Sequence, residues 1–147
     1  MSETVVLDFE IKSPIERVWH ALTDSTMLSE WMFFDPNDFR PVVGHRFQFH
    51  GKPSTGWTMA IDCEVLEADE PRRLSYTWAT EGWSGPHRTT VTWTLTESGK
   101  GVTQLHLEQS GFDSQAKQEI GGAQYGWMHQ LNQLKSLLAP DDNSGEE

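Results

Sequence analysis

The sequence has 147 residues, of which 22 are acidic and 11 are basic, so its formal net charge at pH 7 is −11. This length favours one domain, and the charge argues against nucleic acid and anionic membranes as partners, because both repel such a surface. A single cysteine excludes an internal disulfide, and the lack of a long apolar segment or a signal peptide predicts a soluble, cytoplasmic protein without membrane insertion.

The chain begins with a pattern typical of a half-buried strand over residues 4–11, where apolar and polar residues alternate. After residue 11 the two-residue alternation ends and a helical pattern begins. Ser13, Pro14 and Glu16 match a capping box, which predicts Ser13 as the N-cap and Pro14 as the first residue of a short helix.

A second short helix is predicted for residues 26–32, with Asp24 or Ser25 as its cap. The aromatic residue Trp31 lies near its end. Pro36 and Asn37 then predict a loop.

From residue 46 to residue 110, apolar and polar residues alternate in about five segments separated by turn-forming residues, which predicts an antiparallel meander. The segment Ser98-Gly99-Lys100-Gly101 is typical of a tight hairpin connection. Gly111 is expected to end the sheet. The residues predicted to face inward are Phe47, Phe49, Met59, Ile61, Cys63, Val65, Leu74, Tyr76, Trp78, Val91, Trp93, Leu95, Leu105 and Leu107.

Residues 115–138 carry apolar side chains at three- and four-residue steps, including Trp127 and Leu131, which predicts one long amphipathic helix. The Gly121-Gly122 pair lowers helix propensity and predicts a kink or a later start. Residues 140–147 are acidic and lack apolar side chains, so we expect a disordered tail after a single domain of residues 1–139.

This order predicts an α+β fold of two layers: a curved antiparallel sheet of about six strands, two short helices and a long C-terminal helix across it. Seven Trp, seven Phe and two Tyr are present. Where large aromatic side chains line both layers, the space between sheet and helix is a natural hydrophobic cavity for a ligand.

Several segments resemble the activator of heat-shock-protein-90 ATPase homologue family of the START-like, helix-grip (SRPBCC) superfamily. They are SPIERVW at 13–19, LSEWM at 28–32, EVLEADEPRRLSYTW at 64–78, TVTWTL at 90–95, and Gly126-Trp127 with Leu131 and Leu134. The similarity extends over residues 5–138 and implies a helix-grip fold with a hydrophobic cavity. Superfamily members use this cavity for lipids, polyketides, flavonoid-like aromatics or hormones, and a minority are cyclases or dehydratases. The chaperone-stimulating eukaryotic members carry a separate N-terminal domain, and we expect a single domain without it here.

We predict that aromatic and apolar residues of both layers line the ligand site, and the alternative is a filled core in which they only pack together. Tyr76 stands out because a buried hydroxyl needs a partner, either a ligand or a backbone carbonyl. Trp83 lies in a loop and would form a lid over the cavity or cover the sheet edge. The predicted ligand-binding residues are Trp31, Phe33, Phe47, Phe49, Met59, Tyr76, Trp78, Trp83, Trp93, Trp127 and Leu131.

The sequence shows no signature of a metal site, a cofactor or a catalytic nucleophile. The six histidines lack ligand spacing, and Cys63 lies on an apolar strand face as a small hydrophobic residue would. For acid–base chemistry, Tyr76 is the one inward-facing candidate, with Asp38 and His45 as residues near the mouth.

We therefore favour a non-enzymatic protein that binds an apolar small molecule, with a lipid, a polyketide or a flavonoid-like compound as candidates and stress response as a fitting context. Two alternatives stay open. One is a protein-interaction or co-chaperone-like module, for which no partner surface is localised, and the other is a cyclase- or dehydratase-type enzyme.

Overall fold

The computed structural model describes residues 2–32, 34–37, 39–51, 60–80, 88–113 and 117–138. The predicted site residues Phe33, Met59 and Trp83 and the predicted tail therefore lie outside the described residues. The strands are β1 Ser2–Ile11, β2 Phe34–Asn37, β3 Arg46–Gly51, β4 Ala60–Asp69, β5 Arg73–Thr80, β6 Arg88–Glu97 and β7 Thr103–Asp113. The helices are α1 Ile15–Thr23, α2 Ser25–Trp31 and α3 Lys117–Leu138.

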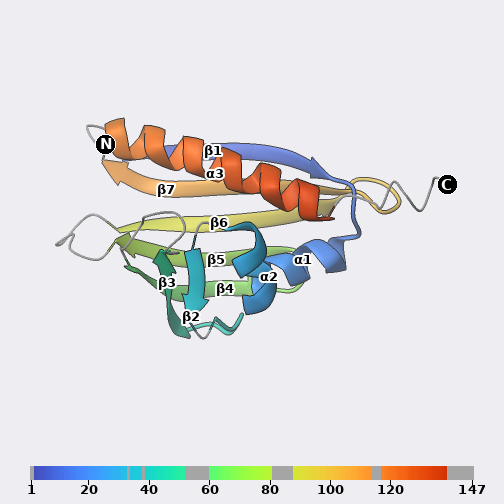
Figure 1. The fold of residues 1–147 in the computed structure, drawn as a ribbon, viewed down its shortest axis with the longest axis horizontal. Helices are drawn as coiled ribbons and strands as arrows, with labels where there is room; N and C mark the ends of the chain where they lie inside the picture. Colours follow the sequence, from blue (N-terminus) through green and yellow to red (C-terminus); the bar gives the residue numbers. More distant parts are fainter. Residues whose placement is uncertain are drawn as a thin grey trace.

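The strands form one antiparallel sheet in the order β1-β7-β6-β5-β4-β3-β2. From β2 to β7 the chain is a meander, and β1 completes the sheet by pairing with β7. In Figure 1, α3 lies along β1 and β7, whereas α1, α2 and β2 lie over the opposite half of the sheet. This arrangement confirms the predicted α+β helix-grip fold.

A short edge strand, β2, occupies the position where Pro36 and Asn37 predict a loop. Its backbone pairs with β3, with Pro36 opposite Phe49. The proline is tolerated because an edge strand has a neighbouring strand on one side only. Its missing N–H therefore does not break hydrogen bonds to a second neighbour. The sheet therefore has seven strands, one more than the alternation pattern alone indicates.

The period-two pattern places apolar side chains on the inner face of the sheet, as predicted. These buried inner residues are Val5, Leu7, Phe47, Phe49, Ile61, Cys63, Val65, Leu74, Tyr76, Val91, Trp93, Leu95, Leu105 and Leu107. The helices cover them with Trp19, Leu22, Leu28, Trp31, Trp127, Leu131, Leu134 and Leu138. No helix within the described part of the chain is both long enough and apolar enough to span a membrane.

The first helix begins one residue later than its capping-box motif predicts. Pro14 is the N-cap of α1, and the buried Ser13 hydroxyl has no hydrogen-bond partner among the described residues. The reason is that the Ser13 backbone is held by the sheet: its N–H donates to the Ile11 carbonyl, and its carbonyl accepts from the Thr103 hydroxyl at 2.8 Å. By contrast, Asp24, one of the two predicted caps, is the N-cap of α2 and accepts the Met27 N–H at 3.0 Å.

Gly111 lies inside β7 and does not end the sheet. Ser110 pairs with Thr4 and Phe112 pairs with Glu3, which leaves Gly111 as an extra residue in β7. Its φ of 97° is in the region that glycine adopts without strain. The glycine therefore forms a β-bulge, a feature that continues a strand while bending it.

Candidate functional site

A connected group of aromatic side chains occupies the inner face of the sheet. We call it the aromatic cluster. It draws on α2, the segment between β2 and β3, the strands β3, β5 and β6, and α3. Its members are Trp31, Phe39, Phe47, Phe49, Tyr76, Trp78, Trp93 and Trp127.

Indole rings join the two layers of the molecule. Trp93 of β6 meets Trp31 of α2 with ring centroids 6.0 Å apart and Trp127 of α3 at 5.4 Å, both nearly perpendicular. Trp127 in turn lies 5.3 Å from Trp78 of β5. Edge-to-face contacts of this kind are favourable beyond the area that they bury. The cluster thus fixes α2 and α3 against the middle of the sheet.

A second arm of the cluster runs along the sheet toward β3. Tyr76 lies 5.6 Å from Phe47, and Phe49 lies 5.6 Å from Trp78. Phe39, which precedes β3, packs against Phe47 at 4.7 Å. The result is a continuous aromatic surface that extends from the β3 side of the sheet to α3.

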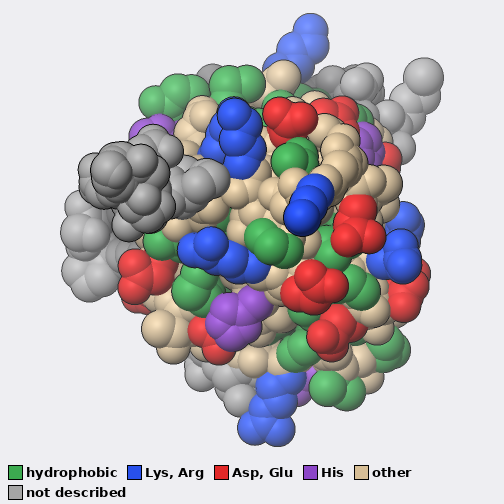
Figure 2. All heavy atoms as spheres, turned by 90° about the vertical axis from the view of Figure 1, so that its right-hand side faces the viewer, with side chains coloured by type: hydrophobic (Ala, Val, Ile, Leu, Met, Phe, Trp, Pro, Cys, Tyr) green, Lys and Arg blue, Asp and Glu red, His purple; other side chains and the backbone are tan. Residues whose placement is uncertain are grey.

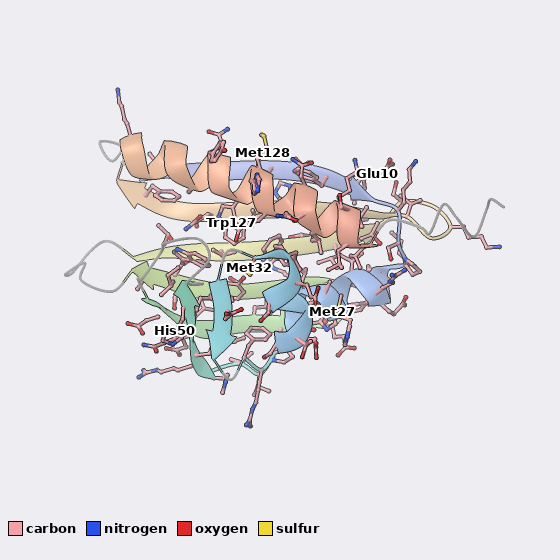
Figure 3. The ribbon with its side chains drawn as sticks, in the orientation of Figure 1. Glu10, Met27, Met32, His50, Trp127 and Met128 are labelled. Carbon is pink, nitrogen blue, oxygen red and sulfur yellow. The ribbon has the colours of Figure 1, made fainter. Side chains whose placement is uncertain are left out.

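The orientation of α3 presents Trp127 to this surface. Trp127 is 2% exposed, whereas the next residue, Met128, is 46% exposed. Figure 3 shows Trp127 on the side of α3 that faces β6 and the middle of the molecule, and Met128 on the opposite side. The amphipathic pattern of α3 therefore positions one aromatic side chain at the interface of the two layers.

The buried indole N–H groups of the cluster have internal acceptors. Trp31 donates to the Ala21 carbonyl at 2.9 Å, and Trp93 donates to the Tyr76 hydroxyl at 3.1 Å. Trp127 donates to the Gln109 side-chain carbonyl at 2.6 Å. Because a buried donor without an acceptor is costly, these bonds fix the indole rings as well as satisfy them.

The Trp127 hydrogen bond is the first in a chain of three hydrogen bonds that crosses the apolar interior. We call this chain the polar thread. The Gln109 amide donates to the Thr89 hydroxyl at 2.8 Å, and that hydroxyl donates to the Trp78 carbonyl at 3.3 Å. Gln109 and Thr89 are both buried. The thread connects α3, β7, β6 and β5, so it positions the same elements that the aromatic cluster joins.

The Tyr76 hydroxyl is the unusual polar group of the cluster. Tyr76 is 2% exposed, and its hydroxyl accepts the Trp93 N–H, since an indole nitrogen can only donate. Within the described residues, the hydroxyl's own proton reaches no acceptor. Burial raises the pKa of Tyr76 well above that of a free phenol, although the Trp93 hydrogen bond partly opposes this shift. Tyr76 is therefore a neutral hydrogen-bond donor at ordinary pH.

Among the described residues, the predicted site residues of the strands lie on the inner face of the sheet, and those of α2 and α3 lie in the core that covers it. Trp31, Phe47, Phe49, Tyr76, Trp93, Trp127 and Leu131 are buried, and Trp78 is half-buried. Leu131 belongs to the same core, one helical turn beyond Trp127.

One member of the cluster, Phe39, and two polar residues beside the cluster, Gln109 and Thr89, were not predicted. Gln109 follows Leu107 at the inward spacing of β7, and Thr89 precedes Val91 at the inward spacing of β6. A polar residue at an inward position is the signal that identifies both. Phe39 lies outside any strand, and periodicity offers no signal for it.

The cluster approaches the molecular surface at Trp78, near one end of the sheet. The strand pairings place Gly51, Ala60, Thr80 and Arg88 at this end, where β3 and β5 end and β4 and β6 begin. Figure 1 shows these strand ends together with the N-terminal end of α3. Trp78, two residues from the end of β5, is the cluster member with the greatest exposure.

Other candidate chemistry is confined to isolated groups. In the part of the chain that the structure describes, no group of three or more His, Cys, Asp or Glu residues could hold a metal ion. Burial and, to a smaller extent, the neighbouring Asp62 raise the pKa of the Cys63 thiol, so it is not a reactive thiolate. His45 stacks over Phe47 with centroids 6.4 Å apart, and Asp38 lies outside the described residues.

Comparisons with known proteins agree with this architecture. Protein MLL2253 from Mesorhizobium loti is 38% identical with a TM-score of 0.83, over 92% of this chain and 96% of that chain. Protein CV1439 from Chromobacterium violaceum is 25% identical with a TM-score of 0.78, over 94% and 98%. CalU16 from Micromonospora echinospora is 25% identical with a TM-score of 0.74, over 95% and 78%.

A search of curated proteins found no match. The family model described as "Activator of Hsp90 ATPase homolog 1-like protein" matches residues 12–139. Membership in such a family is consistent with a ligand-binding fold and is compatible with enzymatic activity. On the combined evidence of sequence and fold, the chain belongs to the family of Activator of Hsp90 ATPase homolog 1-like proteins.

Proposed function

We propose that this protein binds an apolar small molecule between the inner face of the sheet and α3. The aromatic cluster carries the proposal, because it joins the sheet to both α2 and α3 and approaches the surface at the half-buried Trp78. The family and its fold support it as a scaffold for ligands. A lipid, a polyketide or a flavonoid-like aromatic compound is the ligand class that such a surface accommodates.

Aromatic side chains alone supply enough binding energy for a useful affinity. A flat ligand that buries roughly 300 Å² of apolar surface gains about 7 kcal/mol, before the cost of association is subtracted. Micromolar binding then needs no catalytic group. The half-buried Trp78 is the natural place for entry, because ligand contacts there displace the least packing.

The test is a titration of the protein with a fatty acid, a sterol, a flavonoid and a polyketide mimic, followed by the NMR signals of the indole N–H groups. We expect saturable shifts for Trp78, Trp93 and Trp127. Trp19 is a matched internal control, because it is buried in α1 and makes no ring contact with the cluster among the described residues. Its signal should stay unchanged.

A titration in which no compound gives a saturable shift would contradict the proposal. The cluster would then be a filled core, and a protein-interaction role would become the leading candidate. Its first targets would be the exposed apolar residues Val42 and Val43, which precede β3.

Catalysis of a cyclase or dehydratase type is the weaker candidate. Such chemistry needs a group that takes or releases a proton near ordinary pH. Burial raises the pKa of Tyr76, and its hydrogen-bond partner among the described residues is an indole, which does not exchange protons in this range. Tyr76 is thus suited to binding an oxygen atom, and we favour binding over turnover.

A further inference from the structure

We propose that the edge of the sheet formed by β1 is a docking surface for a second copy of this chain. In this dimer the two β1 strands pair antiparallel about a two-fold axis, so that one sheet continues through both protomers. Each copy offers the same surface to the other, which closes the assembly at two chains. The proposal involves no residue of the aromatic cluster and stands independently of the proposed function.

The two edge strands of the sheet differ in how well they are protected against pairing. β2 has four residues and contains Pro36, which cannot donate a backbone hydrogen bond. β1 has ten residues without proline, and among the described residues its only paired neighbour is β7. The extra residue of the bulge, Gly111, lies in β7, so β1 itself runs without interruption. A long, regular edge of this kind presents a row of backbone donors and acceptors to another strand.

The outward side chains of β1 leave this edge accessible. Charged side chains on an edge strand often prevent pairing, but the two carboxylates here are held toward β7. Asp8 contacts His106 at 2.6 Å, and Glu10 accepts from the Gln104 amide at 3.4 Å. Between the exposed Thr4 and Asp8 lies Val6, an apolar residue that is 47% exposed. A partner strand would remove part of this side chain from water.

The sequence of β1 is complementary to itself when the two-fold axis passes through Val6. Val6 then lies opposite Val6 of the second copy. Asp8 lies opposite Thr4, and in the same register Glu10 lies opposite Ser2. An apolar pair therefore occupies the centre, and no two carboxylates face each other directly. This matters because like charges directly opposite each other destabilise a strand pair.

The helix beside this edge contributes a further apolar contact. α3 lies along β1 in Figure 1, and its residues Tyr125 and Met128 are 73% and 46% exposed. Figure 3 shows Met128 on the side of α3 opposite Trp127, which is also the side of the molecule where β1 has its unpaired edge. A two-fold axis at that edge brings the α3 helices of the two copies next to each other. The dimer thus covers Met128 together with Val6.

Long-range charge opposes this dimer and makes it dependent on salt. Each chain has a formal net charge of −11, so two copies repel each other at low ionic strength. Salt shortens the range of this repulsion and leaves backbone hydrogen bonds and apolar contacts in place. We therefore expect association to become tighter as salt is added. A basic strand from another protein would show the opposite dependence, because salt weakens the attraction between opposite charges.

Sedimentation equilibrium of the natural protein is the first test. At roughly 0.5 mM protein in about 0.5 M NaCl, the mass should approach that of two chains, with a dissociation constant at least about threefold lower than in about 50 mM NaCl. Amide hydrogen exchange then locates the surface. The alternate N–H groups of β1 that point away from β7 should exchange rapidly in dilute protein and slowly in the dimer.

A charge placed at the axis tests the register. Val6→Asp should weaken the dimer at least about tenfold, because two carboxylates then lie opposite each other. Leu66→Asp is the matched control, since Leu66 is 45% exposed and gains the same charge on β4, which is separated from β1 by three strands. It should change the dissociation constant by less than about twofold.

A substitution of opposite sign should strengthen the dimer. Thr4→Lys places an ammonium group opposite Asp8 of the second copy, and the two-fold axis creates this pair twice. We expect a dissociation constant about three- to tenfold lower, whereas Leu66→Lys, with the same change in net charge, should have little effect. If Val6→Asp does not fold, Thr4→Lys and the amide exchange of the natural protein still decide the question.

Three outcomes would overturn the proposal. A chain that stays monomeric under both salt conditions would exclude the second copy, and a strand from another protein would become the occupant to seek. A dimer that leaves the β1 amides in rapid exchange, or that weakens equally in Val6→Asp and Leu66→Asp, would have its interface elsewhere. A dimer that becomes weaker as salt is added would be held by opposite charges and not by this edge.

Discussion

The two faces of the same sheet accommodate polar side chains in different ways. On the inner face, Gln109 accepts from Trp127 at 2.6 Å and donates to Thr89 at 2.8 Å, and all three groups are neutral and buried. On the outer face of the same strand, the half-buried His106 lies between Asp8 at 2.6 Å and Glu108 at 2.8 Å, and both carboxylates are exposed to water.

This difference follows from the solvent that each face meets. Water lowers the value of a contact between charges but also removes the penalty for leaving one unpaired. In the interior, each hydrogen bond is stronger, and each missing partner costs more. Figure 2 shows acidic and basic side chains intermixed over the end of the molecule that it faces, as expected of a solvated surface. Substitutions on the inner face should therefore have large effects and those on the outer face small ones.

Replacement of Trp93 by Ala should produce the largest loss of stability. Trp93 is 1% exposed and contacts both Trp31 and Trp127, so its removal takes away buried area and leaves a cavity. We expect a decrease of about 3–5 kcal/mol in the free energy of unfolding, measured by urea denaturation.

The adjacent residue provides the control. Thr94 lies on the outer face of β6, and its hydroxyl accepts from Arg73 at 3.4 Å. Thr94→Ala should cost less than about 1 kcal/mol. Similar losses at the two positions would show that the inner face is not the better packed one.

The second prediction tests whether the polar thread stabilises the folded protein. Gln109→Leu keeps the approximate volume but leaves the Trp127 N–H without its acceptor. We expect a loss of about 1–3 kcal/mol in denaturation experiments. The outward residue Gln104 of the same strand makes longer contacts with Glu10 and Ser98, both 3.4 Å, so Gln104→Leu should be almost neutral.

A double-mutant cycle isolates the bond itself. Trp127→Phe removes the donor, so Gln109→Leu should cost less in the Trp127→Phe background than in the natural protein. If the two losses simply add, the 2.6 Å contact does not contribute to stability, and Gln109 acts through packing alone.

The same contrast explains which parts of the molecule the sequence predicts. Strand periodicity located Phe47, Tyr76 and Trp93 correctly, because a half-buried strand repeats every two residues and hydrophobic burial depends on little else. The four-residue spacing of Trp127 and Leu131 located the inner side of α3, because residues at this spacing share one face of an α-helix.

Features that depend on a partner distant in sequence were missed. The bulge at Gly111 exists because β1 pairs with β7 in a register shifted by one residue, whereas the glycine alone is compatible with either a bulge or a strand end. Ser13 has the sequence of an N-cap, but Thr103, ninety residues away, holds its carbonyl. Gln109 could have been found, since a polar residue at an inward position requires a buried partner.

The smallest expected effect is the pH dependence of the outer face. Hydrogen bonds to Asp8 and then Glu108 raise the pKa of His106 above its usual 6.5, against a minor desolvation that lowers it. Asp8 lies on β1 and Glu108 on β7, while the β6 residue opposite His106 is the uncharged Thr94. Because the folded pKa is above the unfolded one, the stabilisation is complete below about pH 6.5 and is lost as pH rises through the folded pKa.

The natural protein should therefore exceed His106→Gln in stability by at most about 1 kcal/mol at pH 5.5, and the difference should shrink toward alkaline pH and in high salt. Asp8→Asn removes the carboxylate that raises the His106 pKa most and should reduce the same difference, while leaving the Glu108 contact in place. A difference that stays constant with pH would mean that His106 contributes by packing, as an inner-face residue does. A difference that grows with pH would mean that the neutral ring is the form that folding favours.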